Sequence, residues 1–132
     1  MKYRRIPKDE LKKLEEDFIK FLVVNGITAD DWVAIKENEP INADQIINQF
    51  SDVVWEGVLR KTNYLNKVEK DFAYYFKCDN AEIHLVRVLI DEHNKECHVA
   101  TKLYSKQREL EIFEMIQNGC EISQGLEFEA LR

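Results

Sequence analysis

The period of the hydrophobic pattern changes near Lys61, and this change limits the fold more than any other feature of the sequence. Before Lys61 the apolar side chains recur at the three- and four-residue spacing of a helix. After it they alternate, as in a strand with one buried face. Helices that precede a run of strands are typical of the α+β class. We therefore expect three N-terminal helices, a three- to four-stranded antiparallel sheet and a C-terminal helix packed on the sheet.

Local signals set the ends of the expected helices. Helical spacing places the three N-terminal helices over residues 8–25, 29–39 and 43–60. Thr28 and Asp31 have the spacing of a capping box, and so do Asn42 and Gln45. Gly57 lies within the apolar stripe of the third helix, where it costs about 1 kcal/mol relative to alanine. We expect another element to pack closely against Gly57, because such a contact would explain the glycine.

The alternating pattern after Lys61 predicts the sheet. The expected strands span residues 62–65, 72–78, 81–90 and 97–104. Ser105 is suited to cap a final helix over residues 106–118. The conformation of residues 120–132 is left open, because their apolar positions fit either period. The residues expected in the core are Phe18, Phe21, Phe50, Val54, Leu85, Val88, Leu103, Phe113 and Ile116.

The composition fits one globular domain with a well-solvated surface. The chain has 132 residues, of which 45% are apolar and 33% charged, and we expect a single domain over residues 1–132. The net charge is −6. An acidic chain is disfavoured as a partner for nucleic acid or an anionic membrane, because proteins that bind those surfaces present basic faces.

The cysteines indicate a reducing compartment. Cys78, Cys97 and Cys120 are well separated and form no CxxC pair, which favours free thiols over a disulfide framework. The first ten residues lack the apolar region of a secretory signal. The longest apolar run, residues 21–24, is too short to span a membrane. We expect a cytoplasmic protein without a membrane partner.

Three segments of the chain resemble a known family. They are Phe21–Trp32 (FLVVNGITADDW), Phe50–Lys61 (FSDVVWEGVLRK) and Met115–Ser123 (MIQNGCEIS). Together they resemble a family of short bacterial proteins classed as a domain of unknown function, and the resemblance extends over nearly the whole chain. It implies a cytoplasmic bacterial protein, and it carries no activity, ligand or catalytic residue.

Histidines and cysteines in the strand region raise the question of a metal site. His93 and Cys97 have a plausible ligand spacing, but a zinc site needs about four ligands that converge on the ion. Cys97 and His98 are neighbours in an expected strand, so their side chains should point to opposite faces. We predict no metal site and no cofactor. No catalytic residue is nominated either, because the sequence has no Gly-x-Ser-x-Gly motif and no glycine-rich phosphate loop.

Four aromatic residues lie between Lys70 and Lys77, in a segment that superficially resembles the RNP1 strand of RNA-recognition domains. Exposed rings on a strand stack on bases for about 1–3 kcal/mol each. However, Asp71 replaces a glycine of that motif and would repel phosphate. The simpler interpretation is that alternate rings form the core face of a strand. The candidate nucleic-acid contacts are Lys70, Tyr74, Tyr75 and Lys77.

Our lead hypothesis is a small non-enzymatic domain that acts through protein–protein contacts, including self-association. Trp55 and Leu59 lie off the main apolar stripe of the third helix, and large side chains that a core does not need are typical interface anchors. A second hypothesis is single-stranded nucleic-acid binding through residues 72–76. A third is an enzyme or metalloprotein centred on His84, His93 and Cys97. Exposed rings beside lysines would favour the second hypothesis, and a cleft that converges on histidines the third.

Overall fold

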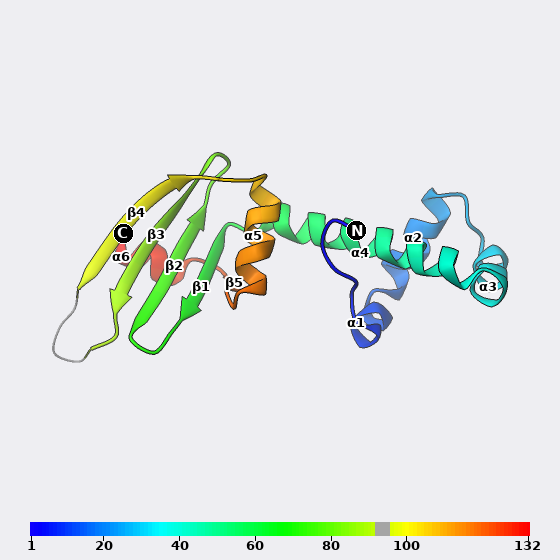
Figure 1. Cartoon of the computed structure of the whole chain (residues 1–132), viewed down its shortest axis with the longest axis horizontal. Coiled ribbons are helices and arrows are strands. Elements are labelled where there is room, and N and C mark those ends of the chain that lie inside the picture. Colours follow the sequence, from blue (N-terminus) through cyan, green and yellow to red (C-terminus); the bar gives the residue numbers. More distant parts are fainter. Residues whose placement is uncertain (92–95) are drawn as a thin grey trace. The chain divides into compact units, whose positions relative to one another are not determined.

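A computed structural model of the chain describes residues 1–91 and 96–132, and it confirms the α+β class (Figure 1). The described residues form six helices and one five-stranded antiparallel sheet, so both kinds of element are more numerous than expected. The chain divides into two compact units, Met1–Gly57 and Val58–Arg132, and each is described by itself. The expectation of a single domain over residues 1–132 stays a prediction.

The elements follow the expected order, with helices first and the sheet second. They are α1 (Lys8–Lys13), α2 (Glu15–Val24), α3 (Ala29–Asn38), α4 (Pro40–Lys61), β1 (Tyr64–Val68), β2 (Phe72–Cys78), β3 (Glu82–Leu89), β4 (Cys97–Leu103), α5 (Arg108–Gln117), β5 (Glu121–Ser123) and α6 (Leu126–Leu131). Among the described helices, none combines the length and the hydropathy that a bilayer crossing requires.

An aromatic cluster forms the centre of the first, helical unit. Phe50 of α4 is 2% exposed, and its ring centroid lies 5.0 Å from that of Phe18 and 5.5 Å from that of Phe21. Trp32 of α3 meets Phe18 edge-on at 5.1 Å. These contacts confirm Phe50 as a core residue. Phe18 and Phe21 belong to the same cluster but are only half-buried.

The segment before α1 is fixed along α4 by two polar side chains. Asp52 accepts hydrogen bonds from the backbone N–H groups of Lys2 at 2.7 Å and Tyr3 at 2.9 Å. Ser51 accepts one from the N–H of Ile6 at 3.1 Å. Tyr3 and Ile6 are buried as a result. Asp52 therefore has a structural role in the first unit.

Two helix boundaries differ from the sequence-based expectation. The helix expected over residues 8–25 is interrupted at Leu14, whose N–H bonds to the carbonyl three residues earlier at 3.0 Å. This tight turn separates α1 from α2. The second difference is at α4, which begins at Pro40 and not at residue 43 as expected for the third helix. Proline fits the first turn because the N–H groups there need no partner within the helix.

Two further local predictions concern a cap and a glycine. The capping box of Thr28 and Asp31 is confirmed, with both hydrogen bonds at 3.1 Å. The close packing expected at Gly57 is wrong, because within the described part of the chain a methyl group placed there would meet no atom of another element within 4 Å. Gly57 is exposed, so the apolar stripe of α4 did not indicate a contact at this position.

The second unit is built on the sheet, whose strand order is β4-β3-β2-β1-β5 with every neighbouring pair antiparallel. Lys77, His84 and Thr101 lie in register on β2, β3 and β4, so their side chains share one face. Glu129 of α6 contacts Lys77 at 3.3 Å. We therefore call this the α6 face.

Helix α5 contacts the opposite face of the sheet, which we call the α5 face, where Met115 lines a pocket together with Tyr74 and Phe76 of β2. Ile83 of β3 and Lys102 of β4 are partners in register on this face, and Glu111 of α5 binds Lys102 there. The C-terminal helix was expected to pack on the sheet. The structure therefore has two such helices, one for each face.

The core of the second unit lies on both faces of the sheet, and its largest fully buried side chains include residues of α4, β1 and α5. Leu59, Leu65 and Ile112 have no exposed surface. Phe113 is buried, which confirms it as a core residue. Leu103 was expected in the core, but this is wrong, because it ends an edge strand and is 71% exposed. The other expected core residues are half-buried, namely Val54, Leu85, Val88 and Ile116.

The strands and the C-terminal tail refine the expected sheet. The first strand spans Tyr64–Val68, two residues beyond the expected start at 62. Residues 120–132, whose conformation the sequence left open, contain β5 and α6. Helix α5 lies within the expected range 106–118, but Ser105 does not cap it.

Candidate functional site

Strand β4 forms one edge of the sheet and, in the described part of the chain, pairs with β3 alone. All seven of its residues are exposed. Val99 is 74% exposed and Leu103 is 71% exposed. The opposite edge, β5, has only three residues. A long exposed edge strand with apolar side chains offers a template for pairing with another strand.

The hydrogen-bond pattern shows which backbone groups of β4 point away from the sheet. The N–H of Leu89 donates to the carbonyl of Glu96 at 3.0 Å. Because the bonds of an antiparallel ladder alternate, the even-numbered residues of β4 are those whose backbone groups turn toward β3. The residues whose backbone groups point outward are Cys97, Val99, Thr101 and Leu103.

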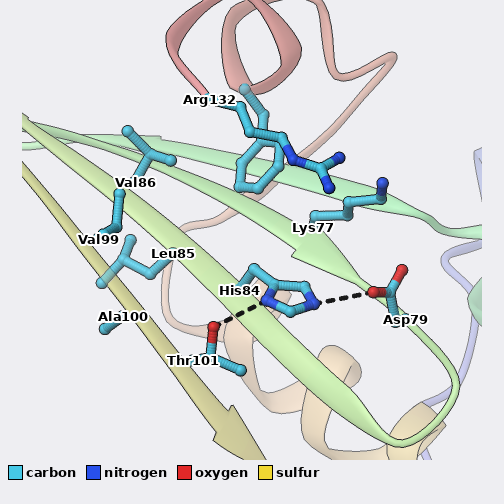
Figure 2. A pocket seen from close by; sticks show the side chains of 10 residues that line it. Lys77, Asp79, His84, Leu85, Val86, Val99, Ala100, Thr101 and Arg132 are labelled. Carbon is cyan, nitrogen blue, oxygen red and sulfur yellow. Dashed lines mark hydrogen bonds and ion pairs between the residues drawn. The ribbon is translucent and has the colours of Figure 1, made fainter.

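A pocket of about 270 Å³ lies on the α6 face beside β4 (Figure 2). Its apolar wall contains Val86, Val99 and Phe128, and its polar wall contains Lys77, His84 and Arg132. Figure 2 shows the charged ends of Lys77 and Arg132 on the same side of the pocket as His84. The pocket therefore has an apolar end and a polar end.

His84 is held by hydrogen bonds to both of its ring nitrogens. Nε2 lies 2.8 Å from Oδ2 of Asp79, and Nδ1 lies 2.8 Å from the hydroxyl of Thr101 (Figure 2). An ionised carboxylate only accepts, so the neutral ring donates from Nε2 to Asp79 and accepts at Nδ1 from Thr101. This assignment connects the end of β2 to β4 through a side chain of β3.

The backbone at Asp79 is fixed by two side chains that follow β4 in the sequence, Tyr104 and Arg108. The hydroxyl of Tyr104 donates to the carbonyl of Asp79 at 2.8 Å, and Nε of Arg108 donates to the same oxygen at 3.0 Å. Burial raises the pKa of Tyr104.

Burial also raises the pKa of the Cys78 thiol to about 11. Cys78 therefore stays a neutral thiol, which is a poor nucleophile and a poor metal ligand.

The two cations of the pocket share one carboxylate. Glu129 lies 3.3 Å from Nζ of Lys77 and 3.5 Å from the guanidinium of Arg132. It also accepts a hydrogen bond from the hydroxyl of Tyr64 at 2.7 Å. That bond lowers the pKa of Glu129 and raises the pKa of Tyr64. Glu129 offsets one of these two positive charges, and Asp79, which also lines the pocket, offsets the other.

Asp79, His84 and Thr101 follow the order carboxylate, imidazole and hydroxyl of an acid–base relay. Acyl transfer also needs donors aimed at a developing oxyanion. Lys77 and Arg132, the two cations of this pocket, are already bound to Glu129. We therefore interpret the three residues as a tie between strands, which fixes β4 on the sheet.

The structure separates the four nucleic-acid candidates. Tyr74 pairs with Lys67 and Arg87 on the α5 face, whereas Tyr75 and Lys77 lie on the α6 face. Lys70 lies in the exposed turn before β2. Alternation along β2 therefore divides these residues between two faces, and nucleic-acid binding through them stays a prediction. The rings of β2 are half-buried, not fully exposed.

The two interface candidates on α4 differ in burial. Leu59 has no exposed surface, so its assignment as a surface anchor is wrong. It belongs to the second unit, where it is a core residue. Trp55 belongs to the first unit and is half-buried, and the guanidinium of Arg4 lies 5.3 Å from its ring centre. A role for Trp55 in an interface stays a prediction.

The residues of the third hypothesis do not converge among the residues described. His84 is in register with Thr101, whereas Cys97 is in register with Val88 near the other end of β4. His93 lies outside the described residues. Cys97 and His98 point to opposite faces, as expected from alternation. Within residues 1–91 and 96–132, no three histidine, cysteine or acidic side chains lie together as metal ligands would.

The edge position of β4 is the feature that sequence reasoning missed. The sequence predicted this strand but could not predict its place in the sheet order. Thr101 and Val99, which line the pocket and carry outward backbone groups, were therefore not singled out. The only available signal was the absence of a following strand that could pair with β4 before residue 106.

Comparisons with known proteins identify a family but no function. A family model described as "Family of unknown function (DUF6495)" matches residues 1–100 and 90–132. This match confirms the resemblance to an uncharacterised family. No curated protein and no solved structure matches the chain. A bacterial origin and a cytoplasmic location stay predictions.

Proposed function

We propose that the chain, which belongs to this family of unknown function, is a protein-interaction domain that binds an extended segment of protein along β4. A single observation carries the proposal. All seven residues of β4 are exposed, and its odd-numbered residues turn their backbone groups away from β3. A strand that adds to such an edge gains main-chain hydrogen bonds without any change in the sheet.

The surfaces on both sides of β4 support this proposal. The side chains of an added strand alternate between the two faces of the sheet. On the α6 face they would lie next to the pocket that contains Val86 and Val99. On the α5 face a smaller pocket of about 170 Å³ is lined by Phe76, Leu85 and Ala100. Pockets for alternate side chains are what gives strand addition its specificity.

Natural edge strands often carry lysine or proline, which discourages pairing. Strand β4 has no proline, and its one lysine, Lys102, binds Glu111 on the α5 face. The ammonium group is therefore held over the face of the sheet and not along the outer edge. The edge lacks the usual protection, which favours a role in binding.

A proline substitution tests the proposal without disturbing the sheet. The N–H of Val99 points outward, so Val99→Pro removes a donor that β3 does not use. Val99→Thr is the matched control, because it keeps the N–H and the β-branched shape. Each purified variant is used to capture proteins from an extract of the native host, and circular dichroism checks that the fold is kept.

We expect wild type and Val99→Thr to enrich the same proteins, and Val99→Pro to lose them. Equal enrichment by Val99→Pro would contradict strand addition at β4. Failure of the wild-type chain to enrich any protein over the bare resin would contradict the proposal as well.

A further inference from the structure

We infer that a second copy of this chain is the partner that β4 binds, through an antiparallel β4–β4 pair centred on Ala100. This inference rests on the proposed function and names its partner. Two copies related by a two-fold axis present the same strand to each other, so the strand must be self-complementary. The exposed side chains and the outward backbone groups of β4 suit such a pair.

The backbone of β4 fits a symmetric pair. Cys97 and Leu103 carry outward groups, and so do Val99 and Thr101. With the axis at Ala100, Cys97 lies opposite Leu103 of the second copy and Val99 lies opposite Thr101. All seven residues then find a partner. Registers centred on Val99 or Thr101 would each leave two residues of β4 without a partner in the other β4 strand.

The α6 face of the pair is formed by apolar and β-branched side chains. Val99 and Leu103 are 74% and 71% exposed in the single chain. The Ala100 register places Val99 beside Thr101 and Leu103 beside Cys97, and each contact occurs twice. Cross-strand pairs of this kind stabilise a sheet by about 0.2–1 kcal/mol each.

Charge also favours β4 as the contact between two copies. Each chain has a net charge of −6, so two copies repel each other over most of their surface. Strand β4 contains no carboxylate. In the proposed register, His98 lies opposite Lys102 on the α5 face. The charge of Lys102 is compensated by Glu111 of its own chain, so no unpaired charges of like sign face each other.

The centre of the pair is suited to close approach. Ala100 is the smallest side chain of β4, and its backbone groups turn toward β3. The two copies of Ala100 would therefore form a non-hydrogen-bonded pair, in which the Cα atoms lie about 4.5 Å apart. A contact limited to seven residues is small, so we expect a weak dimer that forms at high protein concentration.

Cysteine substitutions along β4 test this register, because the rate of disulfide formation between two copies depends on which residues face each other. The background is Cys97→Ser, which removes the exposed thiol of the strand. Val99→Cys, Ala100→Cys and Thr101→Cys are each introduced into it, and disulfide-linked dimer is followed on a non-reducing gel during mild oxidation. The Cα separation expected for Ala100→Cys falls within the range of natural disulfides. The other two positions face a different residue of the second copy.

We expect Ala100→Cys to form disulfide-linked dimer fastest, and the addition of Val99→Pro to abolish its cross-linking. Sedimentation should show a concentration-dependent dimer for wild type that is lost in Val99→Pro. Fastest cross-linking by Val99→Cys or Thr101→Cys would overturn the register. A wild-type chain that stays monomeric at all concentrations would overturn the dimer. If Val99→Pro still loses captured proteins in that case, the proposed function stands without self-association.

Discussion

At the scale of single residues, the guanidinium of Arg108 connects the end of α4 to the end of β2. It donates to the carbonyl oxygens of Leu59 at 3.1 Å and Cys78 at 3.0 Å. Its Nε donates to the carbonyl of Asp79 at 3.0 Å, and Thr62 accepts a further bond through its carbonyl. The side chain is only 11% exposed. One planar group therefore satisfies carbonyls from two elements.

This geometry predicts a loss of stability in Arg108→Lys. An ammonium group keeps the charge but cannot reproduce the planar fork of donors, and a buried carbonyl left without a donor costs about 1–3 kcal/mol. We expect the free energy of unfolding to fall by about 2–4 kcal/mol in urea denaturation. The control is Arg5→Lys, at an exposed ion pair with Asp44. A change in Arg108→Lys no larger than in this control would contradict the role given to Arg108.

Burial of single residues was only partly predictable from the sequence. Helical spacing identified Phe50 correctly, because the centre of a helix face is covered whichever elements pack on it. Leu59 and Leu103 were assigned wrongly for the same physical reason. Period indicates which side chains share a face, but not which other elements cover that face. Near the end of α4 and at the edge strand β4, coverage depends on residues far away in the sequence.

At the scale of elements, the segment that leads into α5 is held by a carboxylate from inside the helix. The carboxylate of Glu111 accepts hydrogen bonds from the backbone N–H groups of Ser105 at 2.8 Å and Lys106 at 3.4 Å, and it binds Lys102. Burial by itself raises the pKa of Glu111. The hydrogen bonds from Lys102, Ser105 and Lys106 outweigh burial, so the pKa lies below its ordinary value of 4.5.

The lowered pKa of Glu111 predicts how stability changes in acid. Because the folded pKa lies below the unfolded one, this stabilisation is present above about pH 4.5 and is lost as the pH falls through the folded pKa. Glu111→Gln should be less stable than wild type at pH 7, and the difference should shrink below pH 4.5. Urea denaturation at a series of pH values measures this. A difference that stays constant down to the lowest pH would contradict a stabilising role of the ionised carboxylate.

The existence of the elements was more predictable than their ends. The change of period at Lys61 and the capping box at Thr28 depend on local sequence, and both expectations hold. The interruption at Leu14 has no glycine or proline to mark it, so the pattern gave one helix where there are two. Strand β5 has three residues, too few for alternation to stand out.

At the scale of the whole molecule, the arrangement of the sheet determines where the candidate site lies. Antiparallel pairing could be expected from consecutive strands joined by short turns. The strand order could not be expected, because β5, near the C-terminus, pairs with β1, the first strand in the sequence. That order leaves β4 at the edge. The candidate site is therefore a property of long-range pairing, which a single sequence does not record.

The distribution of possible ligands over the molecule leads to a last prediction, which concerns metal. Zinc sites need thiolate, neutral imidazole or carboxylate ligands that converge on one point. The ring nitrogens of His84 are both hydrogen-bonded, burial keeps the Cys78 thiol protonated, and Cys97 and His98 point to opposite faces of β4. We therefore expect elemental analysis to find no stoichiometric zinc after purification without added metal. Because a structural zinc ion contributes to folding, we also expect the helical circular dichroism to be unchanged in excess EDTA. About one zinc ion per chain, released only on unfolding, would contradict this prediction and would direct mutagenesis to His93 and Cys97 first.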